Sequence, residues 1–437
     1  MQCVLRSLGV VFLMCSVGVA YAQPPTAPTE VSPDEEQADP PTVSTDDASD
    51  KKQALPRPTQ TDVSLDDEKE LVKALAADAK KSAEKNTTAK ATTRGRSAGT
   101  QSMNPDISII LDVAGAYFSD DDITQLGAHD PKDNGITFQQ LEMAIESTVD
   151  PYFKFNANLV FSLQGIEIEE AYATTLALAG GLQMRAGQFL LPFGRANVKH
   201  PHSWAFVDQL LSIGKFLGSE SMRGLGLEVS WLMPLPWYSK LTAAVHQPPG
   251  ECCGVSYAGD VTEPPTGFED LLYTTRLENF FELSSDWSVL VGGSAIVGEN
   301  KRGLGNLTVL SGADLLIKYR PSNSPLRRGV RLQAEWIHRQ QQVADDLLID
   351  HGGYVELIAD LNPEWSTGYR WQLVTGLDND LFHPDWTDTR QRHSAQVTWY
   401  PSHFSRIRLQ SNFDQLDVFS VMLAFEVVTG AHGAHGY

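Results

Sequence analysis

Glutamates and arginines recur two or four residues apart in several segments of this 437-residue chain. Carboxylates attract cations and guanidinium groups attract anions, and opposed charges across a wet constriction orient dipolar solutes and set ion selectivity. The acidic residues of this set are Glu142, Glu146, Glu167 and Glu169, and the basic residues are Arg331, Arg370, Arg406 and Arg408. Simple solvated charge without selection is the alternative, and the sequence leaves both interpretations open.

Two histidines, His200 and His202, form a second candidate in "VKHPHSW". Imidazole is a good zinc ligand, and positions i and i+2 of an extended segment share a face. Packed or hydrogen-bonded histidines are the competing interpretation, because a His-x-His pair alone is a weak signal. We therefore expect no resident cofactor, with zinc at this pair as the alternative.

The chain contains neither a nucleophile elbow nor the glutamate-bearing zinc motif of metallopeptidases. We therefore predict that it is not an enzyme. A lipase or protease site assembled in space remains an alternative to be tested.

Segments of about ten residues with alternating apolar and polar side chains would position these charges, since a tilted strand of that length crosses a bilayer. A period of two indicates β-strands. The expected strands cover residues 106–117, 136–149, 151–163, 166–178, 181–190, 223–233, 237–247, 270–283, 286–298, 307–320, 327–340, 352–361, 365–377, 391–400, 403–412 and 416–428.

The connections between these segments alternate in length. Short joints such as "AGG", "PLP" and "NPE" alternate with long ones such as residues 191–222 and "QQQVADDLLIDH". Short periplasmic turns and long outer loops are typical of outer-membrane barrels. The sequence thus predicts an all-β fold, a transmembrane antiparallel up-and-down β-barrel of about 16 strands. Its third strand would lie opposite the eleventh, which sets the acidic residues against the basic ones.

The expected outer face is apolar and includes Phe153, Phe155, Val291 and Trp336. Aromatic residues crowd the short joints, as in the interfacial girdle of a membrane barrel. They are Tyr152, Trp237, Tyr238, Trp287, Trp365 and Tyr400.

The N-terminal region differs in texture. Residues 1–22 match a secretory signal peptide cleaved near Ala22. Residues 23–102 are expected to form a disordered acidic, Pro-rich leader with a short helix near 64–85, and residues 103–437 are expected to form the barrel. The adjacent Cys252 and Cys253 are expected not to serve redox or metal chemistry, but to be a strained or intermolecular pair in an exposed loop.

The formal net charge of −21 argues against nucleic-acid binding, which requires a basic patch. The expected partners are outer-membrane lipid, the barrel insertion machinery and small solutes, and a homo-oligomer is left open. The expected location is the outer membrane of a Gram-negative cell.

Four stretches of the chain resemble a proteobacterial family of porin-like outer-membrane barrels, whose members are often labelled zinc-regulated outer membrane proteins. They are "MNPDISIILDVAGAYFSDDD", "LEMAIESTVDPYFKFNANLVFSLQGIEIEEAYATT", "LQMRAGQFLLPFGRANVKHPHSWAFVD" and "GAHGAHGY". The resemblance covers Met103 to Tyr437 and implies location and fold more than substrate. We expect a porin-like channel for passive diffusion of small hydrophilic solutes or ions. The alternative is a non-conducting barrel that binds zinc or a partner through its outer loops.

Overall fold

The computed structural model describes residues 105–430 except 121–123, 164, 260–266, 304, 324–327 and 379. The predicted signal peptide, the leader with its short helix and the histidine-containing tail lie outside the described residues. In the part that is described, no helix is long and apolar enough to cross a membrane.

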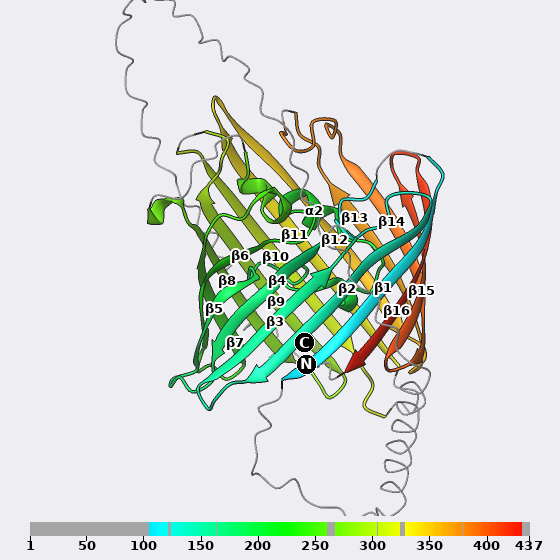
Figure 1. Ribbon diagram of the computed structural model, residues 1–437, viewed down its shortest axis with the longest axis horizontal. Helices are drawn as coiled ribbons and strands as arrows, with labels where there is room; N and C mark the ends of the chain where they lie inside the picture. The colour runs from blue at the N-terminus through cyan, green and yellow to red at the C-terminus, as the bar shows by residue number, and fades with distance from the viewer. Residues whose placement is uncertain are drawn as a thin grey trace, which may run out of the picture. The chain divides into compact units, whose positions relative to one another are not determined.

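Sixteen antiparallel strands of the described residues form one closed barrel (Figure 1), as the sequence predicts. They are β1 (Asp106–Phe118), β2 (Gly135–Thr148), β3 (Phe153–Phe161), β4 (Ile166–Thr175), β5 (Leu182–Leu190), β6 (Arg223–Leu232), β7 (Tyr238–His246), β8 (Leu272–Glu282), β9 (Trp287–Glu299), β10 (Leu307–Tyr319), β11 (Gly329–Val343), β12 (Asp346–Asp360), β13 (Trp365–Val374), β14 (Arg390–Ser402), β15 (Ser405–Asp414) and β16 (Phe419–Gly430). Each strand pairs with its neighbours in the chain, and β1 pairs with β16 from Ser108↔Gly430 to Phe118↔Ser420. This last pairing leaves no open sheet edge, which is the condition for a sheet to stand in lipid.

The helical elements among the described residues are short. They are α2 (Leu211–Phe216) and the 3-10 turns η1 (Pro201–Ser203), η2 (Glu251–Cys253), η3 (Val255–Tyr257) and η4 (Phe268–Asp270).

The outer face of the wall is apolar, as expected. Val291, Trp336 and Phe155 are exposed on it, and they alternate with residues that face the lumen. Large aromatic residues lie exposed near the short turns, where Trp287 packs against Tyr319 with 4.6 Å between ring centroids. An apolar belt with an aromatic rim fits a barrel that spans a bilayer.

One predicted loop is a strand hairpin. The polar run "QQQVADDLLIDH" extends β11 and β12, and Val343 pairs with Asp346 across a two-residue turn at 344–345. The expectation of a long loop here is wrong because the period of two continues through the run. Gln341 and Leu348 are buried and face each other in register, whereas Ile349 is exposed.

Candidate functional site

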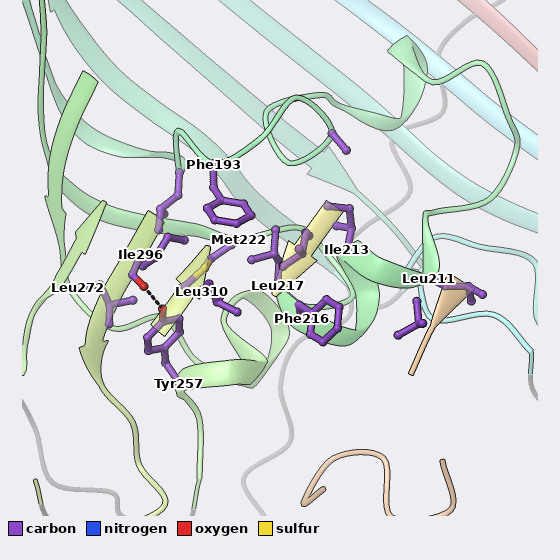
Figure 2. Close-up of a cluster of buried hydrophobic side chains, with 14 of the residues drawn as sticks. Phe193, Leu211, Ile213, Phe216, Leu217, Met222, Tyr257, Leu272, Ile296 and Leu310 are labelled. Atoms are coloured by element: carbon purple, nitrogen blue, oxygen red, sulfur yellow. Dashed lines mark hydrogen bonds between the residues drawn. The ribbon is translucent and has the colours of Figure 1, made fainter. Parts of the chain in front are cut away.

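The connection between β5 and β6, residues 191–222, folds into the barrel, and we call it the inward loop. Phe193, Leu211, Phe216 and Leu217 of this loop are fully buried (Figure 2). They pack against inward-facing wall residues of β8 to β13, which are Leu272, Ile296, Leu310, Ile337, Tyr354 and Val374. Full burial of each large apolar side chain contributes about 1.5–3 kcal/mol, so this cluster fixes the loop inside the lumen.

The first turn of the inward loop is held by its own backbone. The amide of Gly194 donates to Ser294 Oγ at 3.0 Å, and the amides of Arg195 and Ala196 both donate to Glu335 Oε2 at 3.1 Å. Gly194 has a φ of 59°, and a Cβ there would lie 1.7 Å from Glu335 Oε1. Only glycine fits this close approach without displacing the carboxylate.

Asp208 is the polar centre of the loop and is buried. Its carboxylate accepts hydrogen bonds from Arg370, from Arg392 Nη1 at 3.1 Å and from Gln410 Nε2 at 2.6 Å. Burial would raise the pKa of Asp208, but the Arg370 and Arg392 guanidinium groups hold it below its ordinary value. The loop is thereby tied to β13, β14 and β15.

Two further arginines of β15 bind backbone carbonyls of the inward loop. Arg406 donates to the carbonyl of His202 at 2.6 Å and of Trp204 at 3.0 Å, and Arg408 donates to the carbonyl of Phe206. These guanidinium groups therefore position the loop rather than line open water.

The side chains of the two predicted histidines face carboxylates of β2 and β4. His200 Nδ1 is 2.9 Å from Glu169 Oε2 and its Nε2 is 2.9 Å from Glu170 Oε2, while His202 Nδ1 is 2.6 Å from Glu142 Oε2. The two rings stack with 5.7 Å between centroids. Burial alone would lower the pKa of His200, but the carboxylates of Glu169 and Glu142 hold it well above its ordinary value.

A cavity of about 850 Å³ lies beside the inward loop, toward the short-turn ends of the strands. Basic side chains outnumber acidic ones in its lining. The acidic ones are Glu146, Asp208, Glu228, Glu278 and Glu356, and the basic ones are Lys154, Arg185, Arg195, Lys199, Lys240, Arg276, Lys318, Arg331 and Arg370. The cavity is therefore a positively charged compartment inside an otherwise acidic protein.

Most acids of this lining are already paired. Lys154 lies 2.7 Å from Glu146, and Arg185 lies 2.6 Å from Glu228. Lys199, by contrast, donates to the amide oxygen of Gln333 at 3.0 Å. Burial lowers the pKa of Lys199 to about 8, and the positive charge of the neighbouring Arg195 adds to this shift.

The eight predicted pore residues fall into four places. Glu146, Arg331 and Arg370 line the cavity. Glu142 and Glu169 lie under the histidines, and Arg406 and Arg408 bind the inward loop. Glu167 pairs with Arg223, which also lies 2.5 Å from Glu220. The acidic and basic sets thus do not form two free walls across open water, and their part in ion selection remains a prediction.

Glu170 is the functional candidate that strand periodicity misses. Strict alternation would point it toward lipid, but the β3–β4 register shifts between Asn158 and Leu159, and both Glu169 and Glu170 are buried. A β-bulge places two consecutive side chains on one face. The signal in the sequence is the costly glutamate at an expected lipid-facing position.

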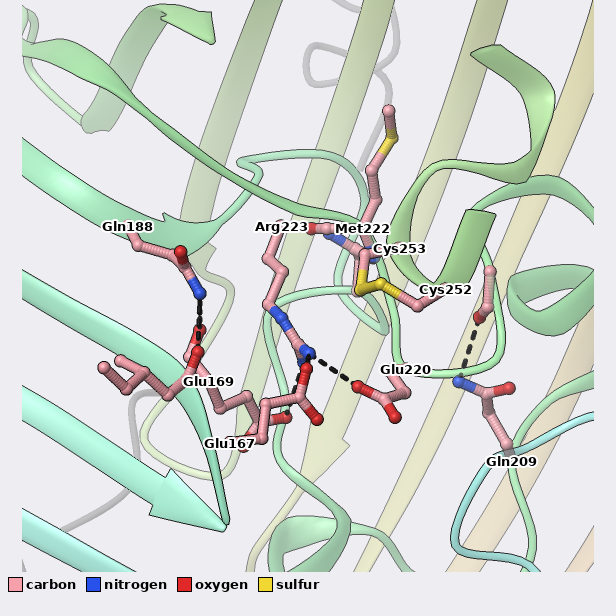
Figure 3. Close-up of a disulfide and its surroundings, with 12 residues drawn as sticks. Glu167, Glu169, Gln188, Gln209, Glu220, Met222, Arg223, Cys252 and Cys253 are labelled. Carbon is pink, nitrogen blue, oxygen red and sulfur yellow. Dashed lines mark hydrogen bonds and ion pairs between the residues drawn. A yellow bond between two sulfur atoms is a disulfide. The ribbon is translucent and has the colours of Figure 1, made fainter. Parts of the chain in front are cut away.

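Cys252 and Cys253 form a disulfide with each other, so of the two expected alternatives the structure has the pair within one chain and not the intermolecular one. Cys253 is buried beside the inward loop, and the Cys252 carbonyl accepts the Glu220 amide at 3.3 Å (Figure 3). The η2 turn brings the adjacent side chains together. Glu167 and Glu220 also lie close to the Cys253 sulfur, but a sulfur in a disulfide is not a thiolate ligand.

No protein-family model matches the chain. An uncharacterized protein of Aquifex aeolicus (strain VF5) is 29% identical over 385 residues, which cover 76% of this chain and 80% of that protein.

Among solved structures, the chain is similar to an anion-selective porin from Comamonas acidovorans, with a TM-score of 0.49, 10% identity, and coverage of 75% of this chain and 99% of that one. It is also similar to the outer membrane channel DcaP of Acinetobacter baumannii, with a TM-score of 0.49, 12% identity, and coverage of 75% and 97%. The architecture described above rests on the chain's own strand pairings.

Proposed function

We propose that this protein is a porin-like channel of a Gram-negative outer membrane, through which small hydrophilic solutes pass passively. The observation that carries the proposal is a closed barrel whose outer face is apolar and whose lumen holds a charged cavity of about 850 Å³. A wall that is apolar outside and polar inside conducts polar solutes where the lumen stays wet. No chemical conversion of the solute is proposed.

We infer further that anions pass more readily than cations. Lys199 and Arg331 line the cavity, and the acids Glu146 and Glu228 are each neutralised by a basic neighbour. Low-dielectric walls focus the remaining positive potential and raise the local concentration of anions.

The inward loop provides the constriction in this proposal. A solute entering from the short-turn side meets the loop residues Pro192 to Leu210 that form one side of the cavity. The pinning of this loop by buried apolar and ionic contacts would give the constriction a fixed shape.

A non-conducting barrel is the second candidate, and the apolar cluster favours it. Phe193, Leu211 and Phe216 fill the lumen against β8 to β13, toward the long-loop ends. In that case the inward loop would be a permanent plug, and the outer loops would bind a ligand or partner.

Single-channel recording in planar bilayers separates the two candidates. We expect stepwise conductance and, across a KCl gradient, a reversal potential of the sign given by chloride preference. Arg331→Gln should reduce that preference, and Arg328→Gln should not, because Arg328 is an exposed arginine in the connection between β10 and β11.

The difference should shrink at high salt, since the Debye length falls from about 10 Å at 0.1 M to about 3 Å at 1 M. A wild-type protein that inserts, shows heat-modifiable gel mobility and never conducts would refute the channel and support the plug.

A further inference from the structure

We propose that Glu142, Glu169 and His200 form a binding site for one divalent transition-metal ion, which joins the inward loop to β2 and β4. One ligand atom from each side chain lies within 4.8 Å of the other two. All three side chains are largely shielded from solvent, and Glu142 is fully buried. His200 also lines the cavity, whereas Glu142 and Glu169 do not, and metal binding here does not depend on conduction.

The charge of the cluster favours a bound cation. Three carboxylates, from Glu142, Glu169 and Glu170, surround two imidazoles. Arg223 lies 3.8 Å from Glu169, but its guanidinium group also forms ion pairs with Glu167 and Glu220. Buried carboxylates are stable when they are paired or bind a metal, and a divalent ion would neutralise the excess here.

The surrounding groups resemble the support that a metal-bound imidazole requires. Such a ring usually donates its second N–H to a carboxylate, which fixes the orientation of the ring. His200 has a carboxylate at each nitrogen, with Glu169 2.9 Å from Nδ1 and Glu170 2.9 Å from Nε2. If Glu169 and Nδ1 bind the ion, Glu170 remains to hold the far side of the ring.

The strand register of β2 and β4 places these ligands close together. The bulge in β4 turns both Glu169 and Glu170 inward, and the β2 register places Glu142 opposite Val160 of the strand between them. The segment "KHPHS" contains the turn η1 and places His200 against Glu169 and Glu170. Bulges next to such constellations usually re-aim a side chain for use.

The ligand types indicate the class of metal. One imidazole nitrogen and two carboxylate oxygens suit Zn²⁺ and its first-row neighbours, with bonds of about 2.0–2.2 Å. Ca²⁺ and Mg²⁺ are bound through oxygen. Because the ligand atoms lie up to 4.8 Å apart, a bound ion would draw the loop slightly closer to the wall.

The test is calorimetric titration of chelator-treated full-length barrel in detergent with ZnCl₂. We expect saturation at one ion per chain, and at least a tenfold loss of affinity in each of Glu142→Gln, Glu169→Gln and His200→Asn. Glu146→Gln on the same strand and His403→Asn in an exposed turn are matched controls that should bind as the wild type does. Equal binding by all five variants, or binding only at millimolar zinc, would overturn the proposal.

X-ray absorption at the zinc edge of the wild type keeps the test decisive if a variant fails to fold. We expect a shell of nitrogen and oxygen at about 2.0–2.1 Å with imidazole scattering and no sulfur. A shell without imidazole, or one containing sulfur, would contradict the assignment. Neither measurement requires conductance, so failure of the channel proposal would leave this result standing.

Discussion

Replacing Asp208 with alanine should release the inward loop from three strands at once. The Asp208 carboxylate accepts hydrogen bonds from Arg370 of β13, Arg392 of β14, and the side-chain amides of Gln410 and Asn412 of β15. Arg392 keeps a second carboxylate, since its Nε lies 3.0 Å from Asp414 Oδ2. For Arg370, Asp208 is the carboxylate in ion-pair range among the described residues.

The expected loss of stability is about 3–5 kcal/mol, which is the usual cost of removing one partner from a buried ion pair. Both arginine side chains are at most 2% exposed, so water cannot easily replace the carboxylate. Asp208→Asn should cost less, because its amide oxygen still accepts the hydrogen bond from Gln410.

Urea unfolding in lipid vesicles, followed by tryptophan fluorescence, measures this loss directly. Asp345→Ala provides the control, since Asp345 is exposed in the β11–β12 turn. Single-channel traces of Asp208→Ala should also show larger or noisier conductance than the wild type, because the loop can leave its anchored position.

An Asp208→Ala protein with wild-type stability and unchanged traces would show that the ionic anchor is dispensable. The apolar cluster around Phe193 and Phe216 would then be sufficient to hold the loop.

Three other changes test separate parts of the structure. Burial and the Asp208 carboxylate raise the pKa of Asp130 from 3.8 to about 6, so the stability that this group contributes is fully present below pH 3.8 and is lost as the pH rises through about 6. The free energy of unfolding should fall by at most about 3 kcal/mol over this range, and Asp130→Asn should abolish the dependence near pH 6. Gly194→Ala should lower the free energy of unfolding by at least about 1–2 kcal/mol from the left-handed backbone alone. Gly250→Ala should be neutral, because Gly250 has a φ of −69° and open space around it. Equal urea midpoints for the two variants would rule out the proposed close approach at Gly194. Val291→Glu should impair folding into vesicles, because a basic residue on the lipid-facing side costs about 2–4 kcal/mol and an acidic one somewhat less. Thr174→Glu should not impair folding, because Thr174 faces the cavity. Equal folding yields would show that the assigned faces are wrong.

The wall of the barrel could be predicted from the sequence because lipid enforces strict alternation. A lipid-facing charge is costly at every strand, so the apolar face of β9 or β13 is visible without knowledge of its neighbours. Prediction failed at the end of β11, where the strands continue past the apolar pattern. The polar run around Gln341 lacks the apolar face that marks the other strands, although its period of two continues.

The interior could be predicted only in part, because lumen charges have partners that lie far away in sequence. Arg408 binds Phe206 across 202 positions, and Glu335 binds Ala196 across 139. Local periodicity shows that such a side chain faces inward, but not what it meets there. The bulge that buries Glu170 is likewise set by pairing with β3 rather than by its own strand.

The inward loop changes how lumen charge should be related to selectivity. Neutralising Arg406 or Arg408 would remove positive field, but it would also free the carbonyls of His202, Trp204 and Phe206, so any shift in reversal potential would combine a field effect with a displaced constriction. Arg331 lines the cavity without such a bond to the loop among the described contacts. A change at Arg331 therefore reports the electrostatic field itself, and a comparison with Arg408 measures how much of the selectivity comes from the position of the loop.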